Sequence, residues 1–190
     1  MKLRDKGFTL IEMVVAIVII VIVSVVALPR FLGISSDARS AIMESVAIAM
    51  RDSADQIQIQ TFLPDTPKVL VADESTETLT VYDVTVEELS TTVRTYNGYV
   101  DGHWENAWRH ILNVGQDISW TSVNDTCTKN ALCGVGNQTT APSIPTPTNP
   151  NNGLVLVWPE NFKLSDLCYA YYNNPEDGSV PTIGAVTTGC

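Results

Sequence analysis

An uninterrupted apolar run near the amino end constrains this chain more than any other feature. The sequence from Phe8 to Leu28 reads FTLIEMVVAIVIIVIVSVVAL, with Glu12 as its single charged residue. At about 1.5 Å per residue, a helix of this length just crosses a hydrocarbon layer of roughly 30 Å. The run therefore predicts a membrane-spanning helix over residues 8–28.

The charges before the run predict its orientation. The seven residues MKLRDKG carry three basic side chains against one acid. Basic residues favour the cytoplasmic side of a membrane, so everything after Leu28 is expected to be exported. A cleaved secretory signal is the alternative, because Val25 and Ala27 offer small-residue spacing, although the run exceeds the usual apolar core of about 7–15 residues.

The composition excludes several classes of protein. With 190 residues, the chain has room for one ordinary domain with a real core. Acidic residues outnumber basic ones 21 to 11, and the formal charge of -10 repels a phosphate backbone, so no nucleic-acid partner is expected. Because 45% of the residues are apolar and 17% are charged, the chain should fold.

Beyond the span, helical periodicity continues to about residue 61. Apolar or small residues recur every three or four positions, at Phe31, Ile34, Ala38, Ile42, Val46, Ala49, Ser53 and Ile57. This spacing predicts that residues 29–61 form an amphipathic second half of the helix. Pro29 and Gly33 are the expected kink sites, because proline removes a backbone donor and clashes with the preceding turn.

Residues 62–190 are expected to form a globular, β-rich head. Strands are predicted at Lys68–Asp73, Leu79–Val86, Ile118–Ser122, Leu154–Trp158, Cys168–Tyr172 and Val180–Val186, with a short helix at Trp104–Leu112. The fold class is therefore α+β, with a long N-terminal helix packed on an antiparallel β-sheet. The proline-rich segment Gln138–Asn152 is interpreted as a surface loop or a partly extended linker within the head.

The amino end resembles that of type IV prepilins. The resemblance is carried by a basic leader, Gly7, the sequence Phe8-Thr9-Leu10-Ile11-Glu12 and the apolar helix. It implies that a prepilin peptidase removes residues 1–7 by cutting after Gly7 and methylates the new amino terminus on Phe8. It also implies the pilin ladle fold. Unlike many pilins, the chain has no glycine from Met13 to Leu28.

Glu12 is the expected assembly residue. A carboxylate at membrane depth is costly and is functional by default, although it stays hydrated if it lies close to the interface. Cleavage after Gly7 creates an α-amine on Phe8, four residues away and on the same helix face. The resemblance assigns Glu12 to neutralise this amine on a neighbouring subunit, so that cleavage licenses assembly.

The run PRFLGISSDAR resembles the mannose-sensitive haemagglutinin (MSHA) class of type IVa pilins. This implies a major pilus subunit for surface attachment and biofilm formation, with surface glycans as a further partner. The implied assembly partners are further copies of the chain, the peptidase, an assembly ATPase, an inner-membrane platform and an outer-membrane secretin. The subunit would start in the inner membrane, with a periplasmic head, and end in an extracellular pilus.

Two other functions stay open. The first is a pseudopilin of type II secretion, which belongs to related machinery and shares the N-terminal signal. The second and less favoured one is a membrane-anchored periplasmic enzyme or binding protein. Such a protein requires a pocket lined by convergent polar groups, which the sequence does not indicate.

Four cysteines lie on the exported side of the span, at Cys127, Cys133, Cys168 and Cys190. An even count in an oxidising compartment favours disulfides, and three connectivities are available. Pairing Cys127 with Cys133 and Cys168 with Cys190 closes the shortest loops. The second bridge also resembles the disulfide-bounded C-terminal region of type IV pilins. A zinc site is the rival interpretation, but no CxxC pair is present.

Catalytic chemistry is weakly indicated. His103 and His110 are the only histidines, and no nucleophile, zinc-protease or phosphate-binding motif accompanies them. Asp101, His103 and Glu105 are conceivable as an acid-base cluster, but Glu105 is also spaced for an ion pair four residues along the same helix. The protein is therefore predicted not to be an enzyme and to need no cofactor.

Two binding chemistries are weakly indicated in the head. Trp104, Trp108 or Trp120 would bind glycans if exposed, although the first two are spaced to pack against a sheet. Asp117 and Asp125 lie in a loop-rich stretch but lack the spacing of an EF-hand, so no metal is predicted.

Overall fold

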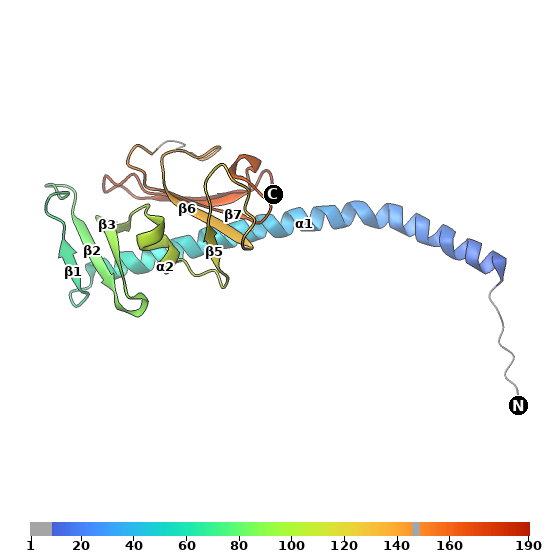
Figure 1. The fold of residues 1–190 in the computed structure, drawn as a ribbon, viewed down its shortest axis with the longest axis horizontal. Coiled ribbons are helices and arrows are strands. Elements are labelled where there is room, and N and C mark those ends of the chain that lie inside the picture. Colours follow the sequence, from blue (N-terminus) through green and yellow to red (C-terminus); the bar gives the residue numbers. More distant parts are fainter. Residues whose placement is uncertain (1–8, 146–148) are drawn as a thin grey trace, which may run out of the picture. The chain divides into compact units, whose positions relative to one another are not determined.

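The computed structural model describes residues 9–145 and 149–190, without the side chains of residues 25–34 and of Glu88. The chain divides into two compact units, of which the first ends at Ala38 and the second spans Arg39–Cys190. Helix α1 (Leu10–Phe62) forms the described part of the first unit and contributes its last turns to the second (Figure 1). The long N-terminal helix is confirmed.

The buried stripe of α1 in the second unit differs in part from the predicted one. Its members are Met43, Val46, Ala47, Met50, Ala54, Ile57 and Thr61. Val46 and Ile57 were expected, but Ile42 is 45% exposed and Ala49 is only half-buried. Met43 follows Ile42 and Met50 follows Ala49, so each lies about 100° further round the helix. These two methionines, both fully buried, form the middle of the buried face. Methionine fits this role because its flexible thioether chain fills irregular gaps.

The carboxyl end of α1 is capped by a lysine side chain from the strand that follows it. No basic residue lies in the last turn of the helix. Lys68, the first residue of β1 (Lys68–Leu70), donates from Nζ to the carbonyl oxygens of Thr61 at 2.5 Å and Leu63 at 3.0 Å. A cation at this end satisfies free carbonyls and is favoured by the helix dipole.

The first sheet has four antiparallel strands in the order β1-β2-β3-β4. The predicted strands at 68–73 and 79–86 correspond to β1 and β2 (Val81–Val86), and η1 (Glu87–Leu89) follows. Strands β3 (Thr91–Tyr96) and β4 (Tyr99–Val100) were not predicted. They turn at Asn97-Gly98, where φ is 51° and 89°, a pair of positive values that an Asn-Gly hairpin accommodates.

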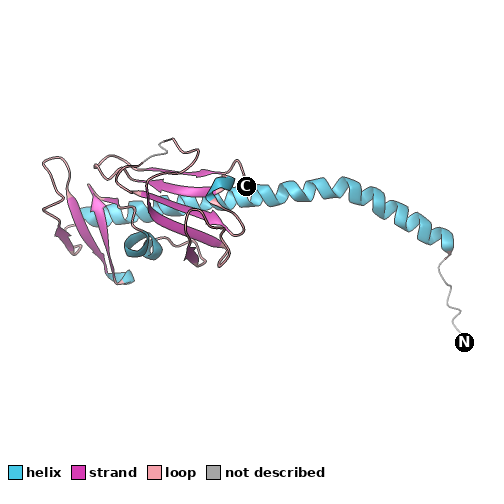
Figure 2. Ribbon diagram, turned by 45° about the horizontal axis from the view of Figure 1, so that its top comes forward, coloured by secondary structure: helices cyan, strands magenta, loops and turns pink. Residues whose placement is uncertain are grey.

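The second sheet has five strands in the order β5-β6-β7-β8-β9. They are β5 (Ile118–Trp120), β6 (Leu132–Gln138), β7 (Leu154–Pro159), β8 (Tyr169–Asn173) and β9 (Thr182–Val186). Strand β6 was not predicted. The predicted α+β class with an antiparallel head is confirmed. The head has two sheets rather than one (Figure 2), and one pair of strands, β5 and β6, runs in parallel. The connection between β5 and β6 crosses back to the end where β5 begins, as a parallel pair requires.

Strand β7 is the centre of the second sheet, and all six of its residues are buried. Its side chains alternate between two clusters: Val155 and Val157 pack with α1, whereas Leu154, Leu156 and Trp158 face the opposite side. A sheet covered on both faces explains why this strand is a continuous apolar run.

The opposite face of this sheet is covered by loops. The segment Gln138–Asn152 was interpreted as a surface loop or linker, but Ala141 and Ile144 are only 5% and 6% exposed. Asn149 is buried and donates from Nδ2 to Asn173 Oδ1 at 2.7 Å and to the Asn174 carbonyl at 2.6 Å. Its described residues, 138–145 and 149–152, are therefore partly a structural cover.

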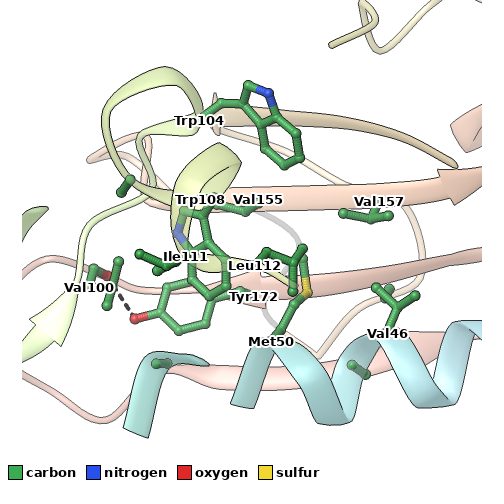
Figure 3. Packing of buried hydrophobic residues seen from close by; sticks show 14 of the residues in the cluster. Val46, Met50, Val100, Trp104, Trp108, Ile111, Leu112, Val155, Val157 and Tyr172 are labelled. Carbon is green, nitrogen blue, oxygen red and sulfur yellow. Dashed lines mark hydrogen bonds between the residues drawn. The ribbon is translucent and has the colours of Figure 1, made fainter. Parts of the chain in front are cut away.

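The predicted helix at 104–112 is present as a π-helical turn, η2 (Trp104–Trp108), followed by α2 (Arg109–Ile111). Trp108 is fully buried and its ring centroid lies 4.4 Å from that of Tyr172. The Tyr172 hydroxyl donates to the Val100 carbonyl at 2.7 Å (Figure 3). This contact connects the turn, the second sheet and the end of the first sheet.

Two disulfides join Cys127 to Cys133 and Cys168 to Cys190, so no cysteine is available for a zinc site. The second bridge fixes the last residue of the chain. Its carbonyl accepts a 2.7 Å hydrogen bond from Arg39 Nε, and the Arg39 guanidinium lies 5.4 Å from the centroid of the Phe162 ring. The carboxyl terminus is thereby attached to α1.

Removing the two disulfides should destabilise the head unequally. The Cys168–Cys190 bridge spans 22 residues and the Cys127–Cys133 bridge spans 6. In the chain-entropy model their loss costs about 3 and about 2 kcal/mol respectively. Urea unfolding of Cys168→Ala/Cys190→Ala, with Cys127→Ala/Cys133→Ala as the matched control, measures both. Equal losses, or a larger loss for the control, would contradict the predicted order.

Candidate functional site

The amino end of α1 is closed by a reciprocal capping box. Thr9 precedes the helix, and its backbone N–H and its Oγ1 both donate to Glu12 Oε2 at 3.0 Å. The Glu12 N–H donates in return to Thr9 Oγ1 at 3.4 Å. This arrangement satisfies backbone donors that the first turn of a helix leaves free. It also holds the carboxylate of Glu12 against Thr9, at the amino end of α1.

Thr9 is a functional residue that the sequence reasoning missed. A threonine followed three residues later by glutamate, just before an apolar run, is the signal of a capping box. The proposed processing residues, Gly7 and Phe8, lie outside the described residues. The pairing of Glu12 with the amine of Phe8 therefore stays a prediction.

The first turns of α1 expose apolar side chains on every face. Every described residue from Thr9 to Ser24 is exposed. Those with large apolar side chains, Leu10, Ile11, Met13, Val14, Val15, Ile17, Val18, Ile19, Ile20, Val21, Ile22 and Val23, are 46–83% exposed. A contiguous surface of this kind is unfavourable in water and marks a site of contact with protein or lipid.

Two predictions for this helix, its kink and its membrane crossing, depend on residues whose side chains are not described. The helical backbone of α1 continues through Pro29 and Gly33, the expected kink sites, and a kink at either stays a prediction. Judged on the described residues alone, no helix combines the length and the apolar character that a membrane crossing requires.

The conceivable acid-base cluster in the head is held by structural hydrogen bonds. Asp101 Oδ1 accepts from the His103 N–H at 3.2 Å, and His103 Nδ1 accepts from the Asn106 N–H at 3.2 Å. Glu105 forms the expected ion pair with Arg109 at 2.7 Å. No group of three or more His, Cys, Asp or Glu among the described residues is arranged to hold a metal, and Asp117 and Asp125 are exposed.

Asp101 is the electrostatically unusual member of this group. Its pKa is raised from 3.8 to about 7, chiefly because burial disfavours the charged carboxylate. The neighbouring carboxylates of Glu176 and Asp83 add to this rise, whereas the His103 N–H and the Arg94 guanidinium oppose it. Glu176 also has a raised pKa, again from burial first, and accepts a 3.1 Å hydrogen bond from the Gly102 N–H.

Comparison with known proteins relates the chain to pilins. Residues 2–28 match the Prokaryotic N-terminal methylation motif. The chain is also 43% identical over 51 residues to the type IV narrow pilus major component PilA5 of Thermus thermophilus. That stretch covers 27% of this chain and 44% of the relative, so the chain spans less than half of its length. No solved structure matches the chain.

The raised pKa of Asp101 predicts a pH-dependent stability. Between about pH 4 and pH 7 the folded state holds a proton that the unfolded chain has lost, so this residue makes stability fall as pH rises through that window. Asp101→Asn should therefore gain stability over the wild type as pH rises from 5 to 7.5. Urea unfolding at both pH values measures this gain.

A nearby control sharpens this test. Asp177 is exposed, and its pKa is lowered, chiefly by the hydrogen bond from the Ser179 side chain. Asp177→Asn should therefore produce no such gain over the wild type between pH 5 and 7.5. A constant difference in stability between Asp101→Asn and the wild type would show that Asp101 ionises normally.

Proposed function

We propose that this chain is a structural subunit of a type IV pilus, which polymerises through the first turns of α1. The observation that carries the proposal is the apolar surface on every face of the helix from Leu10 to Val23. Such a helix requires lipid before assembly and neighbouring helices after it. The methylation motif over residues 2–28 and the similarity to a pilin support this role.

The proposal includes a processing step. A prepilin peptidase removes residues 1–7 and methylates Phe8, and residues 8–28 hold the subunit in the inner membrane with its head in the periplasm. An assembly ATPase, an inner-membrane platform and a secretin then export the filament. These partners and the anchor come from the sequence resemblance.

Glu12 has two roles in this proposal. Within one subunit it caps the helix through Thr9, with both bonds reaching the same oxygen, Oε2. A carboxylate offers about four acceptor positions on its two oxygens, so capping leaves capacity for a further donor. Between subunits that donor is the α-amine of Phe8 on a neighbouring copy, which needs a counter-charge once it is buried.

The finer assignment is an MSHA-like type IVa pilin that serves surface attachment and biofilm formation. The sequence PRFLGISSDAR after the apolar run supports this subclass. In the head, the side chains that could serve as acids or bases, Asp101, His103 and Glu105, are engaged in hydrogen bonds and an ion pair within the fold. This supports a structural role in a filament. Recovery of the chain from sheared surface filaments would favour this role over that of a secretion pseudopilin.

Processing predicts a mature chain that begins at Phe8 with a methylated amine. N-terminal sequencing and intact mass of the protein from membranes measure both properties. Replacing Gly7 with a bulky residue should leave the unprocessed precursor in the membrane. A mature chain that begins at Leu28 would show that the apolar run is a cleaved signal peptide, and the pilus proposal would be wrong.

Glu12→Gln should abolish filament assembly without preventing cleavage after Gly7. Glutamine keeps an acceptor for the Thr9 N–H but removes the counter-charge, and an unpaired buried charge costs about 3–5 kcal/mol in each subunit. Glu12→Val should fail in the same way. The measurement is the ratio of pilin recovered from sheared surface filaments to total processed pilin.

Thr9→Ala is the matched control for this experiment. It removes the hydroxyl of the cap, at a cost of about 0.5–2 kcal/mol, but leaves the carboxylate of Glu12 charged. Filaments should therefore still form. If Glu12→Gln assembles normally while Thr9→Ala does not, capping rather than charge pairing is the function of Glu12.

A further inference from the structure

A groove of about 1200 Å³ crosses the second unit and has no part in the proposed assembly mechanism. It lies between the last turns of α1, the η2–α2 turn and strand β5. Amide side chains line it from three separate places in the sequence, at Gln56, Gln116 and Asn130. Amides of this kind both donate and accept hydrogen bonds, so the groove has the polar character of a site for a hydroxyl-rich ligand.

Two buried polar atoms in the lining residues lack partners. Among the described residues, three buried side-chain atoms have no hydrogen-bond partner: Gln60 Oε1, Trp104 Nε1 and Trp158 Nε1. Gln60 and Trp104 both line the groove. Since nearly all buried polar groups in proteins are hydrogen-bonded, an unpaired acceptor and an unpaired donor at one groove need an explanation.

An exposed tryptophan forms one wall of the groove. Trp120 is 55% exposed and belongs to the edge strand β5, where it pairs in register with Gly134 of β6. A Cβ at Gly134 would collide with the ring of Trp104, so that ring lies over β6 where the side chain of residue 134 would point. Because paired residues of neighbouring strands face the same side, Trp120 and Trp104 share one face of the sheet.

The charges lining the groove are balanced, unlike those of the chain. The lining includes two acids, Glu105 and Asp117, and two bases, Arg109 and Lys129, whereas the whole chain carries a formal charge of -10. The field of the protein as a whole disfavours an anionic ligand. The local balance also offers no excess charge to a cation, so a neutral ligand fits best.

From these observations we propose that the groove binds a neutral oligosaccharide. One sugar ring stacks on the face of Trp120, since aromatic rings present an apolar surface to the C–H faces of sugars. Hydroxyl groups, which donate and accept, pair with the Gln60 amide and the Trp104 N–H. Both atoms are buried, so the proposal requires the half-buried side chain of Gln60 to rotate before a ligand can reach them.

The test is a titration of the full chain in lauryldimethylamine oxide, a detergent without a sugar headgroup. The probes are maltohexaose, cellohexaose, mannohexaose, chitohexaose and the anionic hexagalacturonate. Calorimetry and tryptophan fluorescence report binding. We expect saturable binding of at least one neutral hexasaccharide and weaker binding of hexagalacturonate. Absence of binding by all four neutral probes, or preference for the anionic one, overturns the proposal.

Substitutions locate the binding to the groove. Trp120→Ala should weaken binding of the best probe about tenfold or more, which corresponds to roughly 1.4 kcal/mol. Gln60→Leu, which removes the acceptor without leaving a void, should also weaken it. Phe62→Ala is the control, because Phe62 is an exposed aromatic residue, 67% accessible, that does not line the groove. Unchanged binding by Trp120→Ala overturns the proposal.

The result is separable from that of the pilus proposal. Filament yield from the Trp120→Ala strain, measured by shearing, should equal that of the wild type, because the proposed assembly mechanism uses the first turns of α1 and not the groove. Loss of saccharide binding with normal filaments supports the groove alone. Loss of filaments in this strain would show that Trp120 serves assembly and would overturn a ligand-binding role.

Discussion

The contact between the tilted rings of Trp108 and Tyr172 fixes the arrangement of the head. Both residues are fully buried, and both carry a polar group that needs a partner. Trp108 Nε1 donates to the Asp101 carbonyl at 2.8 Å and the Tyr172 hydroxyl donates to the Val100 carbonyl at 2.7 Å. The two rings thus hold consecutive carbonyls at the end of the first sheet against the second sheet. Met50 of α1 packs in the same cluster (Figure 3), so the helix is placed by the same contact.

The amino-acid sequence of strand β6 is constrained by Trp104, the first residue of the η2 turn, which packs against it. Side chains at Gly134 and Gly136 would collide with the ring and backbone of Trp104, and one at Gly136 also with the Gly102 carbonyl. The two glycines therefore leave the space in which Trp104 packs against the strand. A strand with two glycines has weak β propensity. This is why the sequence did not reveal it, although it lies inside the second sheet, between β5 and β7.

Elements with their own periodic or apolar signal were predictable from sequence. The long helix, strand β2 and the apolar strand β7 were all identified, because each has a local pattern typical of its secondary structure, although the buried stripe of α1 differs in part from the predicted positions. Strand β3 has β-branched residues and an Asn-Gly turn after it, so its signal was present but not used. The parallel pairing of β5 with β6 and the covering role of residues 138–145 depend on contacts distant in sequence, which no local pattern encodes.

The same distinction applies to the candidate sites. Glu12 stood out because a lone acid in an apolar run has few explanations, and its partner Thr9 was readable from the spacing alone. The groove beside Trp120 was not readable, because its lining comes from α1, the η2–α2 turn and β5. Only the fold brings Gln60 and Trp104 to one place, and only the full set of contacts shows that their polar atoms lack partners.

The two roles proposed for Glu12 differ in free energy, and the difference assigns an order to them. A capping interaction contributes about 1 kcal/mol to a helix, whereas an unpaired buried charge costs about 3–5 kcal/mol. In the proposed filament, pairing with the Phe8 amine would therefore dominate once neighbouring helices exclude water, whereas capping dominates while the subunit is alone. The bonds from Thr9 restrict the rotamer of the carboxylate before any neighbour arrives, which lowers the entropy lost when the pair forms. On this argument the cap does not compete with assembly but prepares the charged group for it.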